Sequence, residues 1–365
     1  MRDINSDVAG WLRDFAFLQQ SPQSRWGYKR AASAVLYLPV PIDTLLNSDG
    51  TLHKIPQIGP ASTRVIYEVL QDGTSAIVDQ AMTVAEPKMR ADILRRRGLR
   101  SNFLSRAAAE AAMRTSKPGL PTRADVRCDL QMHSDWSDGG QTLEEIIETG
   151  LSRGYTHSAV TDHSYGLPIA SGLSMERVAA QHAEIDALNA KYQGRFRLLK
   201  GIEANIRADG SVDMTVDELA QLEIVVAAPH SALRSSADQT PRMLGAVQSP
   251  GVHILGHPRG RMYGSRPGVT ADWQRVFVAA ASAGVAIELD GDPSRQDLDF
   301  ELAQLAIGSG CYFAIDSDAH GTDQWWYAET ALAHARLAGI ARDRIINCWP
   351  LAKLLDWAQQ RSRAA

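Results

Sequence analysis

Histidine and carboxylate residues recur in this chain at the ends of short apolar segments. Seven residues share this placement: His133, His163, Glu203, His230, His257, Asp290 and His320. A mixed set of imidazole and carboxylate groups suits Zn, Mn or Fe. Because these residues are remote from one another in sequence, they can bind metal together only if the elements that carry them bring them side by side.

The apolar segments themselves predict such elements. They span residues 126–133, 157–163, 198–204, 224–230, 252–257, 285–290 and 312–320. Most are separated by stretches of helical periodicity, and strands that alternate with helices are typical of an α/β fold with a parallel sheet, here closed into a barrel. Since barrel chemistry gathers at the carboxyl ends of the strands, the sequence predicts a site on one rim.

Short spacings support a metal site at this rim. Gln131 and His133 are two residues apart, as are Asp318 and His320, and such pairs point the same way in an extended segment. Asp138 lies in the loop just past the first segment. One histidine at a strand end is more often structural, but five of the ten histidines end predicted strands here. So many ionisable groups need cations or much water around them, which favours metal binding.

Composition indicates a soluble globular protein, with 44% hydrophobic and 22% charged residues. The first residues include acids where a secretory signal would be apolar, and no apolar run approaches the length of a membrane span. We therefore expect a cytoplasmic protein without a membrane partner. Cys128, Cys311 and Cys348 form no CxxC pair, so neither a disulfide framework nor a zinc ribbon is expected, and each is predicted to be a buried small apolar residue.

Charge is distributed unevenly along the chain. Up to Cys128, basic residues outnumber acidic ones by six, and in the remainder acidic residues outnumber basic ones by ten. A basic N-terminal part favours a polyanionic partner, and excess carboxylate in the barrel is what a cation site contributes. An ordinary solvated surface accounts for the same pattern equally well.

The N-terminal part is predicted to be helical from residue 1 to 82, with a break at 52–60. Backbone amides at this break, next to a helix N-terminus, could hold a phosphate, although an ordinary turn between helices is the simpler interpretation. Residues 83–127 are Arg-rich and are predicted to be a basic connector, partly helical from Lys88 to Arg114. The barrel domain is predicted to occupy 128–365.

Several sequence strings resemble the PHP domain, named for polymerases and histidinol phosphatases. They are DLQMHSDWSDG (129–139), TDHS (161–164), GIEANI (201–206), APHS (228–231), GHPRGRMYGSRPG (256–268), AIELDGDPSRQDL (286–298) and DSDAH (316–320). They are most similar to the version found at the C-terminus of bacterial X-family DNA polymerases. The resemblance implies a distorted seven-stranded βα barrel that holds up to three divalent metal ions, Zn or Mn or else Fe.

The resemblance also implies ligands for each ion. The first set is His133, Glu203 and Asp318 with Gln131, the second is Asp138, His163 and His320, and the third is Glu203, His230 and His257. Gln131 departs from the usual histidine, and an amide oxygen is a poorer ligand for these metals, so occupancy of the first set stays open.

Two arginines complete the implied barrel site. Arg261 matches a family arginine that could clamp a substrate phosphate, with Arg259 as a helper. Two surface arginines in a mobile loop are an equally good interpretation.

Two N-terminal strings, YKRAA (28–32) and IPQIGP (55–60), resemble the helix-hairpin-helix domain of the same polymerases. The resemblance implies DNA contacts at Ile58 and Gly59. Gln57 stands where the hairpin usually has Gly. Val65 stands where lyase members have their Schiff-base lysine, and there is no room for a polymerase palm between 83 and 127. Neither lyase activity nor polymerisation is therefore expected.

The combined resemblance implies a metal-dependent phosphoesterase that acts on DNA ends, as a 3′–5′ exonuclease or a 3′-phosphatase in DNA repair. A small-molecule phosphomonoesterase of histidinol-phosphatase type is the alternative, with a small phosphate ester as its substrate. A non-catalytic DNA-binding protein is a second alternative. The sequence leaves the native metal and the oligomeric state open.

Overall fold

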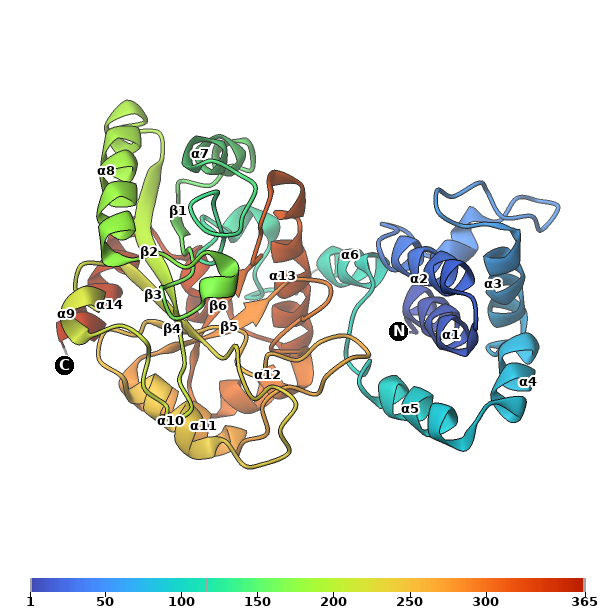
Figure 1. Ribbon diagram of the computed structural model, residues 1–365. Helices are drawn as coiled ribbons and strands as arrows, with labels where there is room; N and C mark the ends of the chain where they lie inside the picture. The colour runs from blue at the N-terminus through green and yellow to red at the C-terminus, as the bar shows by residue number, and fades with distance from the viewer. Residues whose placement is uncertain (1, 116, 364–365) are drawn as a thin grey trace. The chain divides into compact units, whose positions relative to one another are not determined.

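The computed structural model describes residues 2–115 and 117–363, which form two compact units (Figure 1). The first unit contains the described residues up to Thr115 together with Tyr263–Ser265. The second contains the rest of the described chain. The division thus falls near 115, whereas the sequence predicted a hairpin domain ending at 82 and a connector up to 127.

The named elements of the first unit, within its described residues, are helical. They are α1 (Ile4–Leu18), α2 (Pro22–Leu36), the short 3-10 helix η1 (Ile42–Leu45), α3 (Pro60–Asp72), α4 (Ala76–Val84), α5 (Pro87–Gly98) and α6 (Arg106–Arg114). Their core is built from fully buried side chains such as Leu12, Val35 and Ile66, which recur at helical spacing. Val65, at the position of the family lysine, also belongs to this core.

Helices α5 and α6 occupy much of the predicted connector. The Arg-rich run belongs to the first unit because its charges have a partner there. Asp14 is buried, and its two carboxylate oxygens contact Arg97 Nε and Arg100 Nη2, each at 2.6 Å. A buried carboxylate is costly unless it is paired, so two of these arginines serve the fold.

The predicted break at 52–60 is a hairpin that leads into α3. Gly59 precedes this helix, Pro60 begins it, and the Ile58 N–H donates to the Ile55 carbonyl (3.2 Å). Gln57 has φ of 69°, in the left-handed region that favours glycine. The position therefore has the backbone conformation of a glycine while carrying a side chain.

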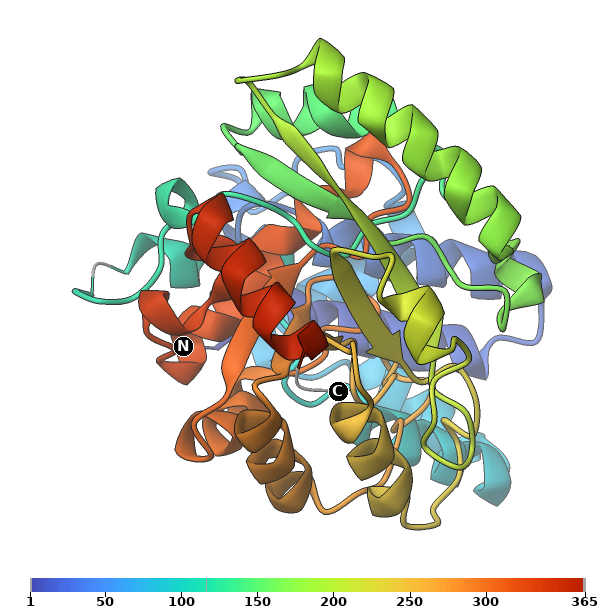
Figure 2. The ribbon, with the colours of Figure 1, turned by 90° about the vertical axis from the view of Figure 1, so that its left-hand side faces the viewer.

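The second unit is built on one sheet of six parallel strands in sequential order. The strands are β1 (His157–Val160), β2 (Arg197–Asn205), β3 (Ile224–Ala228), β4 (Ile254–Leu255), β5 (Ala286–Asp290) and β6 (Tyr312–Asp316). The helices are α7 (Leu143–Ser152), α8 (Met175–Lys191), α9 (Val216–Leu219), α10 (Thr240–Gln248), α11 (Trp273–Ala283), α12 (Phe300–Gly308), α13 (Tyr327–Ala338) and α14 (Leu351–Arg363). The α/β prediction is confirmed, and the helices lie outside the strands (Figures 1 and 2).

The first of the seven predicted strands, 126–133, is extended but is not a regular strand. The carbonyls of Asp129 and Met132 accept hydrogen bonds from Ala159 and Thr161 at β1, whereas the carbonyl of Gln131 accepts from Asp318 beyond β6. In a regular strand the carbonyls of residues 129 and 131 would point to the same side. The alternation therefore slips by one residue, as in a β-bulge.

Side chains replace the missing ladder bonds of this segment. Three of its N–H groups donate to neighbouring side chains: Asp129 to Ser158 (3.2 Å), Leu130 to Asp316 (2.8 Å) and Met132 to Thr161 (3.0 Å). The segment thus lies between β1 and β6 without pairing regularly with either. The expected seven-stranded barrel is six strands plus one irregular segment.

Helix α14 covers the amino end of the strands and lies across them in Figure 2. Leu354 and Ala358 of this helix, with Trp349 before it, pack against inward residues near the strand starts, among them Ile224 and Ala286. The apolar core therefore fills one end of the barrel and leaves the carboxyl ends for polar residues. Among the described residues, no helix combines the length and apolarity needed to cross a membrane. Cys128 and Cys311 are buried as predicted, whereas Cys348 is partly exposed.

We predict a pH dependence of stability from His253, which is buried against α14. Its Nδ1 accepts from Val225 N–H (3.0 Å), and its Nε2 lies 3.0 Å from the Ala358 carbonyl. Burial lowers the pKa of His253 to about 4. The unfolded chain therefore binds a proton more readily, so this stabilisation is complete above pH 6.5 and is lost as pH falls to about 4.

The expected loss from this one group is on the order of 3 kcal/mol. Thermal unfolding followed by tryptophan fluorescence between pH 7 and 4 measures it. His253→Gln should flatten the slope, and His53→Gln, at an exposed position, is the control for loss of a histidine. An identical slope in wild type and His253→Gln would contradict the assignment.

A second prediction concerns the hairpin. Because a side chain in the left-handed region costs about 1 kcal/mol, Gln57→Gly should raise the free energy of unfolding of the first unit by about 0.5–1 kcal/mol. Gln57→Ala keeps the β-carbon and is the control. Urea unfolding of the full chain measures both variants, and a glycine variant less stable than the alanine variant would refute the strain.

Candidate metal centre

The predicted ligands meet at the carboxyl end of the sheet. Glu203 lies within β2, and the other strands deliver theirs just after their last residues: His163 after β1, His230 after β3, His257 after β4, and Asp318 and His320 after β6. His133 comes from the irregular segment and Asp138 from the loop that follows it. In a parallel sheet these ends share one edge, which is why residues far apart in sequence become neighbours.

Glu203 is the centre of the cluster. Its Oε1 lies 3.1 Å from His230 Nε2 and 3.3 Å from His257 Nε2. Its Oε2 lies 3.2 Å from His163 Nδ1 and 3.3 Å from His133 Nε2. Burial opposes ionisation, but these imidazoles hold the pKa of Glu203 well below its usual range. The carboxylate is therefore a buried anion shared by four rings.

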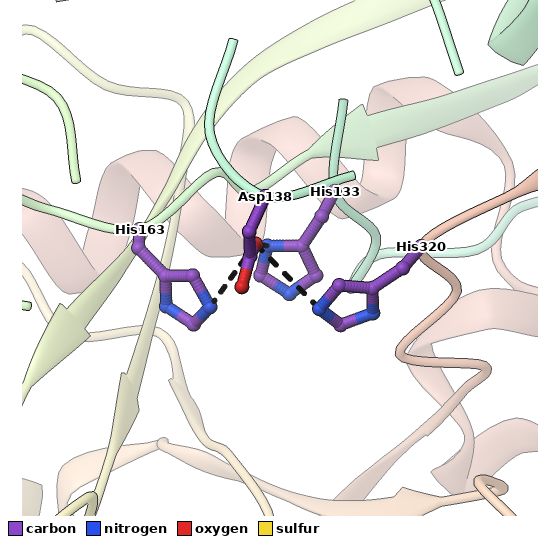
Figure 3. Close-up of side chains that lie close together, drawn as sticks. All are labelled: His133, Asp138, His163 and His320. Atoms are coloured by element: carbon purple, nitrogen blue, oxygen red, sulfur yellow. Dashed lines mark ion pairs between the residues drawn. The ribbon is translucent and has the colours of Figure 1, made fainter. Parts of the chain in front are cut away.

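Asp138 forms a second meeting point, nearer to solvent (Figure 3). Its Oδ1 lies 3.6 Å from Nε2 of both His163 and His320, and 3.9 Å from His133 Nδ1. Gly139 makes this placement possible, because a β-carbon there would lie 2.4 Å from the His133 carbonyl oxygen. The loop can therefore fold tightly over His133 only with glycine at this position.

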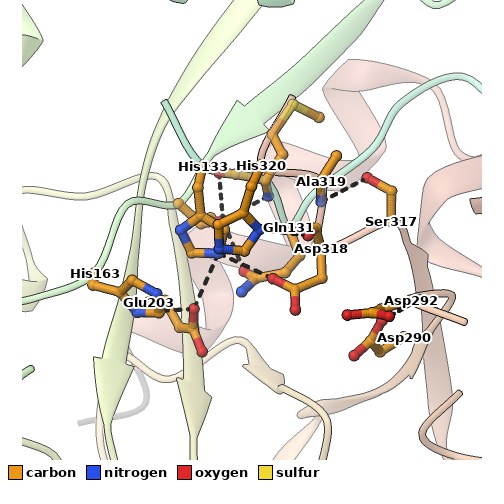
Figure 4. A network of polar contacts seen from close by, with 12 residues as sticks. Gln131, His133, His163, Glu203, Asp290, Asp292, Ser317, Asp318, Ala319 and His320 are labelled. Carbon is orange, nitrogen blue, oxygen red and sulfur yellow. Dashed lines mark hydrogen bonds and ion pairs between the residues drawn. The ribbon is translucent and has the colours of Figure 1, made fainter. Parts of the chain in front are cut away.

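Asp318 joins the cluster from beyond β6 (Figure 4). Its Oδ1 lies 3.1 Å from His133 Nε2 and its Oδ2 lies 2.7 Å from Arg295 Nη1. Asp318 and His257 have φ of 52° and 22°, values that are unfavourable for residues other than glycine. Such backbone strain costs about 1–3 kcal/mol and persists only where surrounding contacts enforce it.

Neighbouring groups orient the histidine rings. Nδ1 of His230 lies 3.1 Å from Asn205 Oδ1, and Nδ1 of His320 lies 2.9 Å from the Asp318 carbonyl. Nδ1 of His257 lies 3.3 Å from Glu288 Oε2. In each ring Nε2 is left to face a carboxylate of the cluster, which is the arrangement of metal-binding histidines. Sequence reasoning missed Asn205 and Glu288, although both lie in the quoted strings GIEANI and AIELD.

Two histidines differ in their proton affinity. Burial lowers the pKa of His163 to about 4, outweighing the attraction of Glu203, so its ring is neutral at neutral pH. Burial also disfavours a charged His133, but hydrogen bonds to Asp318 and Glu203 raise its pKa to about 10. His133 is thus one of the groups that carry positive charge beside the carboxylates when no metal ion is bound.

The cluster fits metal ions on two observations. Buried atoms without a well-aligned hydrogen bond among the described residues gather here: both oxygens of Glu203, both ring nitrogens of His257, and Nδ1 of His133 and of His163. Ligand atoms also lie close enough to share an ion in four groups: His133, Asp138, His163 and His320; His163, Glu203 and His230; His133, Glu203 and Asp318; and His257, Asp290 and Asp318.

These groups overlap the predicted sets. His133, Glu203 and Asp318 of the first set are grouped again, without Gln131, and His133 joins the set of Asp138, His163 and His320. In the third set His163 is grouped with Glu203 and His230, although His257 also touches Glu203. The fourth group was not predicted. Asp290 was placed on the rim, but no spacing pattern linked it to Asp318.

Gln131 lies beside the cluster with its oxygen engaged. The Thr161 hydroxyl donates to Gln131 Oε1 at 2.7 Å. The amide oxygen predicted to bind metal therefore already has a partner in this conformation, and its role as a ligand stays a prediction.

Arg259 and Arg261 are held by carboxylates of the loop that follows β5. Arg259 contacts Asp297 Oδ1 (3.0 Å) and Asp299 Oδ2 (2.6 Å), and Arg261 Nη1 lies 3.1 Å from Asp299 Oδ2. Both arginines are largely buried, so the interpretation as mobile surface arginines is wrong. Their contacts order the loop, and substrate binding by either residue stays a prediction.

Ile58 and Gly59 lie in the first unit, at the hairpin. Together with Pro60, Thr63 and Arg64 they line a shallow hollow beside the first turn of α3. Backbone N–H groups at such a helix start favour anions. DNA contact at these two residues stays a prediction.

Individual proteins of known sequence resemble this chain. No family model matches the chain. The chain is 36% identical over 223 residues to DNA polymerase/3′-5′ exonuclease PolX of Bacillus subtilis, a match that covers 61% of this chain and 39% of the polymerase. It is 28% identical over 248 residues to a probable phosphatase of Thermoanaerobacter sp., which covers 64% of this chain and 96% of that protein.

These matches confirm the resemblance to PHP-type phosphoesterases that was drawn from the motifs, and they support a metal-dependent phosphoesterase. A solved histidinol phosphate phosphatase from Lactococcus lactis, complexed with Zn, L-histidinol and phosphate, matches with a TM-score of 0.46 and 17% identity over 58% of this chain and 94% of that one. That likeness is too low to carry an argument.

Metal binding by the cluster should depend more on Glu203 than on any other carboxylate. Glu203→Gln removes the charge shared by four imidazoles, so metal affinity should fall by about 10- to 100-fold. Glu223→Gln is the matched control, because Glu223 pairs with Arg197 (2.8 Å) and is not one of the clustered residues. Elemental analysis after dialysis against graded Mn or Zn measures both variants. Equal metal content in the Glu203 variant and wild type would refute the central role.

Proposed function

We propose that the protein is a metal-dependent phosphoesterase that acts on DNA ends, removing 3′ nucleotides or 3′ phosphates. The observation that carries this proposal is the convergence of imidazole and carboxylate ligand atoms around Glu203. It is supported by the identity to a relative whose name includes 3′-5′ exonuclease.

We propose up to three divalent ions, Zn or Mn or else Fe, on the groups that share His133, His163 and Glu203. When bound, such ions polarise phosphoryl oxygens and lower the pKa of water. The residues of the chain hold these ions in place. Glu203 Oε2 faces His133 and His163 while its Oε1 faces His230 and His257, and Asp138 closes the outer group from its glycine-supported loop.

Charge explains why phosphate would enter this hollow. Asp138, Glu203 and Asp318 supply three negative charges, which three divalent ions would exceed. The filled site would therefore be positive within an acidic domain, and a phosphate ester is a fitting anion. With the amino end of the barrel filled by α14, the open rim is the end at which a substrate reaches these residues.

The first unit supports DNA rather than a small ester as the substrate. Its hairpin offers a helix start, the hollow beside Gly59 and the nearby cation Arg64, which is 70% exposed although it pairs with Glu68 at 3.5 Å. We propose that this surface binds the DNA backbone through phosphate contacts, which are independent of base sequence.

A small phosphate ester is the second candidate substrate. It is favoured by the match that covers 96% of a probable phosphatase, because that match is to a protein of little more than the barrel's size. The non-catalytic alternative would require that the cluster bind no ion.

One paired assay tests the proposal. Full chain loaded with Mn would be incubated with a 3′-recessed duplex, the same duplex ending in a 3′ phosphate, and histidinol phosphate. Release of nucleotide or phosphate from either duplex is the expected result, and Glu203→Gln should abolish it. Turnover of histidinol phosphate alone would favour the small-ester function, and no turnover by metal-loaded protein would refute both enzymatic functions.

A further inference from the structure

Arg295 contacts the candidate metal centre, although no role was inferred for it from the string AIELDGDPSRQDL that contains it. It lies with Asp292 in the loop that connects β5 and α12, and Asp290 is the last residue of β5. Arg295 Nη1 lies 2.7 Å from Asp318 Oδ2, while Oδ1 of the same carboxylate lies 3.1 Å from His133 Nε2. One carboxylate therefore joins this guanidinium to the imidazole cluster.

The surroundings of Arg295 require a positive charge. Its Nη1 lies 3.9 Å from Asp290 Oδ2, and its Nε lies 4.0 Å from Asp292 Oδ2. Asp290 and Asp292 lie on the far side of Asp318 from the imidazoles (Figure 4). A guanidinium stays protonated in proteins, so Arg295 is a fixed cation here. Arg295 is the protein's own cation in the group of His257, Asp290 and Asp318.

Arg295 also has the means to bind an anion. Its side chain is 22% exposed, compared with 8% for Arg261. Its Nε is buried and has no hydrogen-bond partner among the described residues. A guanidinium carries five N–H donors in a planar fork that matches phosphate, and the contact with Asp318 does not occupy them all. The donors that this contact leaves unoccupied are the ones that would bind an anion beside Asp318.

We propose that Arg295 is a specificity-determining residue that binds the terminal phosphate of a phosphomonoester and so favours its hydrolysis over cleavage of a phosphodiester. The inference rests on the proposed phosphoesterase function and makes a terminal phosphate the preferred substrate class. A monoester is close to a dianion at neutral pH and has three terminal oxygens, whereas a diester has one charge and two such oxygens. A fixed cation therefore binds the monoester more strongly than the diester.

The reaction concerned is simple hydrolysis. A water oxygen forms a bond to phosphorus, the bond from phosphorus to the ester oxygen breaks, and the alcohol leaves with a proton. Arg295 would hold the terminal oxygens during this exchange and would neither give nor take a proton.

The test compares Arg295→Gln and Arg295→Lys with wild type in the Mn-loaded full chain. The substrates are p-nitrophenyl phosphate, a monoester, and bis(p-nitrophenyl) phosphate, a diester. Arg295→Gln should lower kcat/KM for the monoester by about 100-fold and for the diester by less than about 5-fold. Arg295→Lys should recover part of the monoester rate because it restores the charge without the fork. Arg275→Gln, on the exposed face of α11, is the control for loss of one positive charge.

Metal content and thermal unfolding of each variant separate the remaining outcomes. Equal losses on both substrates, or a loss of bound metal in both Arg295 variants, would assign Arg295 to holding Asp318 and overturn the proposal. An unchanged monoester rate would overturn it as well. If metal-loaded wild type cleaves neither substrate nor the DNA ends above, the proposed function itself fails, which is a different result from a change in preference.

Discussion

The structure of this site depends on one buried carboxylate. Glu203 places two oxygens among four imidazole rings and is almost wholly removed from solvent. A lone buried anion would be costly, and without it the three buried rings and the partly exposed His230 would have no anion beside their nitrogens. Each requirement is met by the other, and both are met only at the edge where the strands end together.

The rest of the barrel can be understood as support for that arrangement. Apolar residues and α14 fill the amino end, so polar groups are confined to the carboxyl end. Around the cluster lies a second group of polar residues that hold the ligands: Asn205 and Glu288 fix rings, and Asp162 accepts hydrogen bonds from Ser134 and from Gln181. Strain at Asp318 and His257 shows that these contacts are strong enough to impose unfavourable backbone conformations.

Much of this could be predicted from the sequence because strand ends are a local signal. Each apolar segment that closed on His, Asp or Glu did deliver that residue to one rim. The irregularity of 126–133 could not be predicted, since its register depends on Ser158, Thr161 and Asp316, which lie in other elements. The place of the Arg-rich run in the first unit could not be predicted for a similar reason: Asp14, far from it in sequence, pairs with two of its members.

Charged residues in loops were the hardest to interpret. A motif match drew attention to Arg259 and Arg261, but a motif does not reveal whether a cation faces substrate or a carboxylate of its own chain. Arg295 lies in the quoted string AIELDGDPSRQDL and was passed over, because its relation to Asp318 exists only after β5 and β6 pair. Pairing across the sheet, and not spacing along the chain, decides such roles.

The slipped register of residues 126–133 has a consequence for how the barrel closes. Residues 126–133 are connected to β1 and β6 partly through hydroxyl and carboxylate side chains, where the other strands use peptide groups. These side chains can be changed by substitution. The same segment carries Gln131 and His133 to the metal cluster. Substitutions at Ser158 or Thr161 can therefore shift the position of His133 while the six-stranded sheet stays intact. Residues 126–133 are thus the part of the barrel whose position is most easily changed.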